Sequence, residues 1–309
     1  MFERVFKLSE HKTTVKTEVM AGITTFMTMA YILAVNPSVL GSTGMDTTAV
    51  LLATALASCL GTLCMAFMAN LPFALSAGMG LNAFMAYTVV AGYGYSWQVA
   101  LLAVFIEGLI FIVLSLTNIR EAIFNAIPLT LKKGVSVGIG LFIAFIGLQN
   151  SGLCVDSATL VGIISFPENF HTAGICALLT LIGLFFTAVF YTRKMKGAIL
   201  YGILLTWILG MLCQVTGLYV PTPDAGFYSL FPSWGMTDFS KLGLTFGQCF
   251  NVDFSAVGIV NFIVVIFSFL FVDIFDTLGT LIGVATKAKM LDKDGKLPGI
   301  KPALLADSI

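Results

Sequence analysis

The chain has 309 residues, of which 58% are hydrophobic and 10% are charged, and its 16 basic side chains balance its 16 acidic ones. Soluble domains carry about 25% charged residues, so this composition excludes an ordinary soluble protein and predicts a polytopic membrane protein. Zero net charge argues against nucleic acid as a partner. The six cysteines and two histidines show no metal-ligand spacing, so we expect no metal and no cofactor.

Apolar runs of membrane-spanning length follow one another along the chain. A span needs about 20 mostly apolar residues. The candidate spans are 19–40, 48–69, 73–92, 97–117, 128–149, 171–191, 197–217 and 257–285. No cleaved signal peptide is expected, because the first run is long and lacks a small-residue cleavage site. The connection 218–256 is rich in Pro, Gly and aromatic residues, which indicates a structured surface loop.

The basic residues are distributed unevenly between the connections. If these eight spans alternate, 15 of the 16 Lys and Arg residues fall on one side of the membrane, and Lys241 alone falls on the other. Positive charge is retained on the cytoplasmic side. We therefore expect a multi-pass protein of the cytoplasmic membrane with both termini in the cytoplasm.

The last run contains "FSFLFVDIFDTLGTLIG" (267–283), with two aspartates inside an apolar segment. Each central Asp costs about 2.5–3.5 kcal/mol on insertion scales, whereas each Leu or Phe returns about 0.3–0.6 kcal/mol. Asp273 and Asp276 are three residues apart and share a helix face, which Thr280 extends. The alternative is a structural Asp pair bonded to neighbouring helices. Intramembrane carboxylates are functional by default, and two so close do not both ionise easily, as a proton-coupling site requires.

Two further spans carry polar groups. "SAGMGLNAFMAY" (76–87) is interrupted by glycines and Asn82, and broken helices near the bilayer midplane point to a transporter site. Close helix packing would explain the glycines, but it explains Asn82 poorly. Glu107, in the middle of the fourth run, is either a coupling group or an interhelical tether. Asn36-Pro37 indicates a kink or the end of the first span. No Ser–His pair or metal cluster is present, so we expect no enzyme.

Three motifs together resemble one transporter family: "MAGITTFMTMAYILAVNPSVL" (20–40), "SAGMGLNAFMAYTVV" (76–90) and "FLFVDIFDTLGTLIGVA" (269–285). They are similar to the AzgA-like purine permeases, the hypoxanthine/adenine/guanine branch of the nucleobase–cation symporters. The resemblance implies proton-coupled uptake of a purine nucleobase across the cytoplasmic membrane, with Na⁺ as the alternative coupling ion. It leaves the oligomeric state open, with a homodimer as one arrangement.

The resemblance also assigns roles to residues. Asp273 would hydrogen-bond the purine, and Asp276 would support it or couple it to protons. Asn82 and the local backbone at Ala83 and Phe84 would contact the base from the third span. Thr280 and Glu107 are the further candidates for support or coupling.

The implied fold is all-α and uracil-permease-like, with fourteen spans in two inverted repeats of seven. On this pattern the chain holds the first eight spans, and we expect it to be the N-terminal part of a longer permease. The implied divisions are a core domain with spans 1–4 (1–118), a gate domain with spans 5–7 (119–217), an extracytoplasmic loop (218–256), and span 8 with a cytoplasmic tail (257–309).

Three other functions remain as alternatives. An anion transporter of the same fold would favour basic residues at its site over two carboxylates. A non-transporting sensor would bind no substrate. An intramembrane aspartyl protease would bring its acids from two facing helices, whereas Asp273 and Asp276 lie on one.

Overall fold

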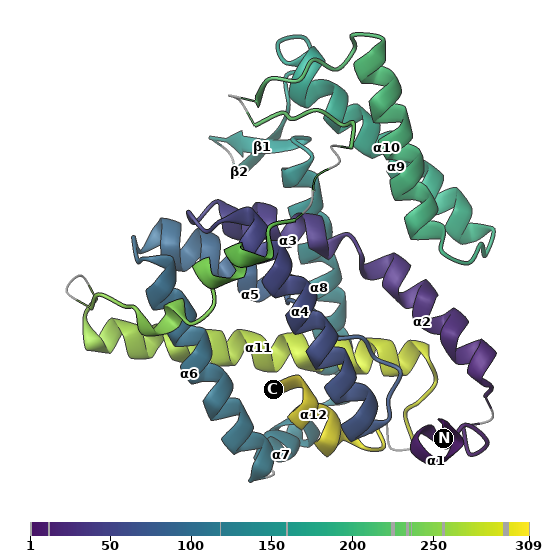
Figure 1. The fold of residues 1–309 in the computed structure, drawn as a ribbon, viewed down its shortest axis with the longest axis vertical. Coiled ribbons are helices and arrows are strands. Elements are labelled where there is room, and N and C mark those ends of the chain that lie inside the picture. The colour runs from purple at the N-terminus through teal and green to yellow at the C-terminus, as the bar shows by residue number, and fades with distance from the viewer. Residues whose placement is uncertain are drawn as a thin grey trace. The chain divides into compact units, whose positions relative to one another are not determined.

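The computed structural model describes residues 2–11, 13–117, 119–158, 160–223, 226–232, 235, 237–254, 257–292 and 297–308. The chain divides into two compact units (Figure 1). Unit 1 comprises residues 1–19, 30–141 and 237–309, and unit 2 comprises residues 20–29 and 142–236. Within the described residues, 7 helices are long and apolar enough to cross a membrane, which confirms the prediction of a polytopic helical membrane protein.

Among the described residues, the named elements are helical except for one short hairpin. The first part of the chain forms α1 (Phe2–Phe6), α2 (Val15–Met29), α3 (Ile32–Gly41), α4 (Thr47–Cys64), η1 (Met65–Ala69), α5 (Met79–Ala83), η2 (Phe84–Gly92), α6 (Trp97–Leu116), α7 (Ile119–Ala126) and α8 (Leu129–Asn150). The remainder forms β1 (Cys154–Ser157), β2 (Leu160–Ile163), η3 (Phe170–Gly174), α9 (Ile175–Thr192), α10 (Ala198–Val215), η5 (Phe239–Leu244), η6 (Gln248–Phe250), α11 (Ile259–Lys287) and α12 (Ile300–Ser308). Strands β1 and β2 pair antiparallel.

The third predicted span is only partly helical. Its helix begins at Met79 and ends at Gly92, so at 1.5 Å per residue it measures at most about 21 Å, against about 30 Å for the hydrocarbon core. The segment 70–78 that precedes it contains no helix, and Gly78 is extended, with φ −74° and ψ 116°. The predicted interruption of this span is therefore confirmed.

Two hydroxyl groups of α4 hydrogen-bond to this non-helical segment, one to its backbone and one to a side chain. Thr62 Oγ1 accepts a hydrogen bond from the Leu75 backbone N–H at 3.0 Å and lies 3.2 Å from the Leu75 carbonyl oxygen, to which it donates. One turn earlier on α4, the hydroxyls of Ser58 and Ser76 are 2.7 Å apart. Irregular backbone is tolerated at membrane depth only where protein or a cavity satisfies its polar groups. Thr62 satisfies two such groups, the N–H and the carbonyl oxygen of Leu75.

The first and last spans differ from expectation in their backbones. The first span is broken at Ala30–Tyr31, between α2 and α3, while Asn36 and Pro37 both lie inside α3. The first span therefore does not end at Asn36-Pro37, and its helical interruption lies earlier in the chain. The last span is interrupted only in polarity, because α11 is one continuous helix of 29 residues. An Asp in a helix interior costs less than about 0.7 kcal/mol in propensity, so two of them do not break it.

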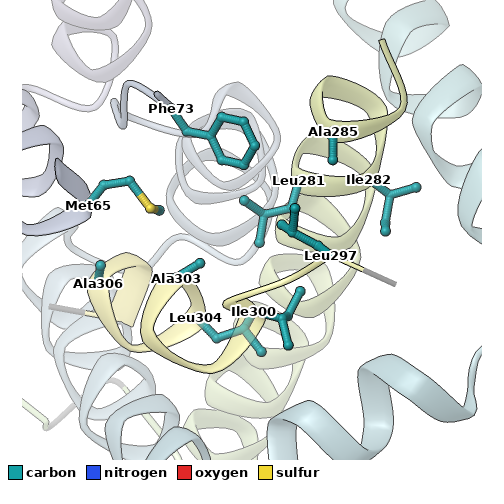
Figure 2. Close-up of a cluster of buried hydrophobic side chains, with 10 residues drawn as sticks. All are labelled: Met65, Phe73, Leu281, Ile282, Ala285, Leu297, Ile300, Ala303, Leu304 and Ala306. Carbon is teal, nitrogen blue, oxygen red and sulfur yellow. The ribbon is translucent and has the colours of Figure 1, made fainter. Parts of the chain in front are cut away.

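The chain after α11 packs back into unit 1. Apolar side chains of η1, α11 and α12 form one buried cluster with Phe73 and Leu297, which Figure 2 shows. The cluster contains Met65, Phe73, Leu281, Ile282, Ala285, Leu297, Ile300, Ala303, Leu304 and Ala306. In Figure 2, Leu297 lies between Leu281 of α11 and Ile300 of α12. The segment expected as a tail therefore includes a helix that is anchored by hydrophobic burial.

The described parts of the loop 218–256 make hydrogen bonds in both units. In unit 2, the Trp207 indole N–H donates to the Leu230 carbonyl oxygen at 2.8 Å, and the Tyr219 hydroxyl donates to the Tyr228 carbonyl oxygen at 2.7 Å. In unit 1, Lys241 Nζ lies 3.1 Å from Asp46 Oδ2. Asp46 is also the N-cap of α4, where it accepts from the Ala49 backbone N–H at 2.9 Å.

The capping bond predicts a pH dependence of stability. The Ala49 N–H, and next the Lys241 ammonium, lower the pKa of Asp46 below the ordinary value of about 3.9. A depressed pKa means that the ionised carboxylate stabilises the fold above the ordinary pKa and that this contribution is lost as the pH falls through the folded-state pKa. Asp46→Asn should therefore lower the melting temperature of the detergent-solubilised protein at pH 7. The difference from the unsubstituted protein should shrink as the pH approaches 3, and a difference that is independent of pH would contradict the assignment.

Candidate functional site

One face of α11 carries the acidic residues found in the sequence. Phe269, Asp273 and Asp276 are four and then three residues apart, so they project from the same side of the helix. Phe269 is fully buried, and both aspartates are half-buried. The two carboxylates thus face protein, where a charged group in a span is tolerated.

The broken third span lies against this face at two points. A Cβ atom added to Gly78, the residue before α5, would lie 2.7 Å from Asp276 Oδ2. The ring of Phe84 meets the ring of Phe269 edge-on, with centroids 5.0 Å apart. The chain direction is opposite in the two helices, because Gly78 pairs with the later residue and Phe84 with the earlier one. Asp273 on α11 therefore lies between the two contacts, opposite the part of the third span that contains Asn82.

The start of α5 lies beside the Asp276 carboxylate. Gly78 is the N-cap of α5, and the first N–H groups of a helix have no partner within the helix. The partial positive charge at this end favours a nearby anion. The absence of a side chain at Gly78 lets the carboxylate come this close. Close helix packing, the structural explanation given for the glycines of this span, is therefore observed at Gly78.

The amide of Asn82 is tied to α3 and α4. Its Nδ2 donates to Asn36 Oδ1, and Asn36 Nδ2 donates to Thr54 Oγ1 at 2.7 Å. Asn36 and Thr54 are 4% and 5% exposed. The sequence analysis assigned Asn36 to a kink and did not single out Thr54. The signal that could have found them is a buried amide and hydroxyl in apolar spans, since such groups need partners.

The helix changes its hydrogen-bonding pattern at the next two candidates. Helix α5 ends at Ala83, which is buried, and the π-helix η2 begins at Phe84. The Phe84 N–H is shared between the carbonyl oxygens of Gly80 and Leu81. Single π-turns inside helices recur at functional sites. The backbone predicted to contact a ligand is therefore locally irregular.

The remaining two candidates are Thr280 on α11 and Glu107 on α6. Thr280, one turn beyond Asp276, is exposed. Glu107 is 5% exposed on α6, on the same stripe as Ala103 and Ser115. Ala103 belongs to the buried cluster that contains Phe269, and the Ser115 hydroxyl lies 3.1 Å from that of Ser308 in α12. Glu107 thus lies on the α6 face between the contacts with α11 and with α12.

Two hydrogen bonds beside the acidic face join α11 to other helices, and the sequence analysis did not anticipate either of them. Thr277, next to Asp276, donates to Asp307 Oδ2 of α12 at 2.8 Å. Beyond it, Ser136 of α8 donates to the Gly279 carbonyl oxygen at 2.6 Å. These hydrogen bonds hold α8 and α12 against the half of α11 that carries Asp276.

The chain is similar to known permeases over almost its entire length. Residues 16–309 match the family described as "Permease family" (Xan_ur_permease). The chain is 46% identical to MJ0326 of Methanocaldococcus jannaschii, over 99% of this chain and 65% of that protein. It is 41% identical to the adenine permease AdeP of Escherichia coli, over 100% of this chain and 64% of AdeP. It is 42% identical to the guanine/hypoxanthine permease PbuO of Bacillus subtilis, over 98% of this chain and 66% of PbuO. The chain thus spans about two thirds of the length of these relatives.

The contact between Gly78 and Asp276 can be tested by adding one methyl group. Gly78→Ala should lower the free energy of unfolding by about 1–3 kcal/mol, the usual cost of overpacking. Gly80→Ala is the matched control, because a Cβ at Gly80 meets nothing within 4 Å, and it should be neutral or stabilising by up to about 1 kcal/mol. Denaturant titration in mixed micelles measures both.

A double-mutant cycle separates this contact from a general effect on the helix. In the background of Asp276→Ala, the cost of Gly78→Ala should largely disappear. An equal cost in both backgrounds would show that Gly78 does not press on Asp276.

Proposed function

The chain belongs to the Permease family, and from this membership we propose that the whole protein takes up a purine nucleobase across the cytoplasmic membrane together with protons. The observation that carries the proposal is the position of Asp273. It lies on the buried face of α11, between the Gly78–Asp276 and Phe84–Phe269 contacts. The names of the relatives AdeP and PbuO, an adenine permease and a guanine/hypoxanthine permease, support the substrate class.

The chemistry of a purine suits the groups gathered here. Hypoxanthine, adenine and guanine present N–H donors and ring-nitrogen acceptors in one plane. An ionised carboxylate accepts hydrogen bonds, and an amide both donates and accepts. Asp273 would accept from the base on one side, while Asn82 and the irregular backbone at Ala83 and Phe84 would contact it from the third span.

Proton coupling rests on the second carboxylate. Asp276 is three residues from Asp273 on the same helix face, so two negative charges would repel each other in a poorly solvated site. Binding a proton at Asp276 relieves this repulsion and links protonation to the occupancy of Asp273. Glu107 and Thr280 are secondary candidates for this role. We assign transport rather than catalysis to the site, with H⁺ as coupling ion and no cofactor.

The orientation follows from charge. The expected alternation of spans places 15 of the 16 basic residues on one side, and cytoplasmic retention of positive charge would put the amino terminus in the cytoplasm. Import would then run from the side that contains the Asp46–Lys241 pair.

An anion transporter of the same fold is less well supported. The described basic residues of the membrane-spanning helices, such as Lys16 and Lys287, lie at or near helix ends, whereas Asp273, Asp276 and Glu107 lie inside them. An anion at this face would meet negative charge first. Inhibition of uptake by an oxyanion, with no competition from any nucleobase, would favour this alternative.

Removing the charge of Asp273 tests the binding role. Uptake of labelled hypoxanthine and adenine is measured in cells that lack their own purine transporters and express the complete gene. A hydrogen bond to a charged group is worth about 1.5–3 kcal/mol, so Asp273→Asn should reduce uptake at low substrate concentration by at least about tenfold. Asp238→Asn makes the same change at an exposed loop residue that bonds Ser240, and it should leave uptake unchanged. Wild-type uptake and pH dependence in Asp273→Asn would refute the assignment.

The coupling role of Asp276 has a separate readout. In Asp276→Asn, an inward proton gradient should no longer accelerate uptake, because the side chain cannot exchange a proton. Exchange of labelled for unlabelled base at equal pH should continue. Retained acceleration by the gradient would exclude Asp276 as the coupling group.

A further inference from the structure

Three polar side chains from three different helices form a hydrogen-bonded chain beside the candidate site. It runs from Asn82 of α5 through Asn36 of α3 to Thr54 of α4, and it ends at the Val50 carbonyl oxygen. The residues it joins are 46 and then 18 positions apart in the sequence. Asn36 and Thr54 are buried, so each unsatisfied group among them would cost about 1–3 kcal/mol.

The direction of every hydrogen bond in this chain is set from its buried end. A hydroxyl has one hydrogen, and Thr54 Oγ1 donates it to the Val50 carbonyl oxygen at 2.7 Å. Toward Asn36, Thr54 can therefore only accept, so the Asn36 atom facing it must be Nδ2. The other end of the Asn36 amide is then its oxygen. Because Asn36 Oδ1 can only accept, Asn82 must face it with Nδ2.

This orientation decides what Asn82 can offer to a ligand. The oxygen and nitrogen of an amide lie on opposite edges of the group. With Nδ2 held against Asn36 on α3, the Oδ1 atom of Asn82 is turned away from α3. Were the amide free to rotate, it would present either a donor or an acceptor, and recognition would be ambiguous.

We propose that Asn36, held by Thr54, is a positioning residue that turns the Asn82 amide so that its oxygen is left to accept a hydrogen bond from an N–H group of the ligand. The inference rests on the proposed function and extends it. The site then presents two acceptors, Asn82 Oδ1 and the Asp273 carboxylate, so it selects a nucleobase that supplies N–H groups at both places. Asn36 itself does not touch the ligand.

The experiment uses uptake of labelled hypoxanthine by the protein expressed from its complete gene, with unlabelled hypoxanthine and its singly N-methylated derivatives as competitors. Thr54→Val removes the hydroxyl at nearly constant shape and frees the Asn36 amide to turn over. Asn36→Ala removes the link altogether. Thr54→Ser keeps the hydroxyl and is the matched control.

The expected result is a change in substrate recognition rather than in the amount of transporter at the membrane. Asn36→Ala should raise the apparent KM about tenfold or more, and Thr54→Val should raise it in the same direction, while the maximum rate per transporter at the membrane changes by less than about twofold. For the N-methylated derivative that the unsubstituted protein rejects most strongly, the discrimination against it should fall in Thr54→Val. Thr54→Ser should restore both the KM and the discrimination.

Other outcomes overturn the proposal. An unchanged KM and unchanged competitor ranking in Thr54→Val would show that the three hydrogen-bonded side chains only hold the helices together. A lower level of transporter at the membrane with an unaltered KM would show the same. If the Asn36→Ala protein does not reach the membrane, the KM and competitor ranking of Thr54→Val alone test the proposal. Absence of purine uptake by the unsubstituted protein would refute the proposed function itself, and the inference with it, whereas normal uptake in every variant would refute the inference alone.

Discussion

Asp276 lies inside a membrane-spanning helix with its carboxylate against Gly78 at the start of α5, and the absence of a side chain at Gly78 allows this close approach. An isolated carboxylate in hydrocarbon would cost several kcal/mol. The positive end of the α5 backbone dipoles, which favours a nearby anion, lies on the side of this helix that faces the Asp276 carboxylate. The geometry of Asp273, Asn82 and Phe84 follows from this contact, because it sets the register between the third span and α11.

A half-length helix creates a second requirement, since the backbone before it has no helical partners. Thr62 of α4 meets part of this requirement at the Leu75 backbone, and Ser58 of α4 bonds the side chain of Ser76 in the same segment. The same helix supplies Thr54, which anchors the amide chain to Asn82. Helix α4 thus helps to position the non-helical segment and the Asn82 amide, although it contributes no candidate ligand-binding residue. A substitution on α4 that removes a hydroxyl should therefore affect the site through its position rather than through direct contact.

The candidate site contains two kinds of polar group, carboxylates and an amide, to which the proposed function gives different roles. In the proposed function, the carboxylates of α11 would bind the coupling proton, and the amide of the third span would present a fixed acceptor, because its Nδ2 atom is committed to Asn36. Neither group could perform its part alone in hydrocarbon, since each needs partners from another helix. On this proposal, recognition and coupling would both depend on how polar groups are satisfied at the interface between helices.

The sequence alone determined the features that depend on local chemistry. The lengths of the apolar runs predicted the spans, and carboxylates in an apolar run marked Asp273 and Asp276, because the cost of placing them there is independent of the fold. The tertiary structure alone decided the partners: Gly78 against Asp276, Asn36 between Asn82 and Thr54, and the packing of α12 onto α11. A residue's type shows that it needs a hydrogen bond, but its partner lies on another helix. Only the crossing and register of the helices bring the two together.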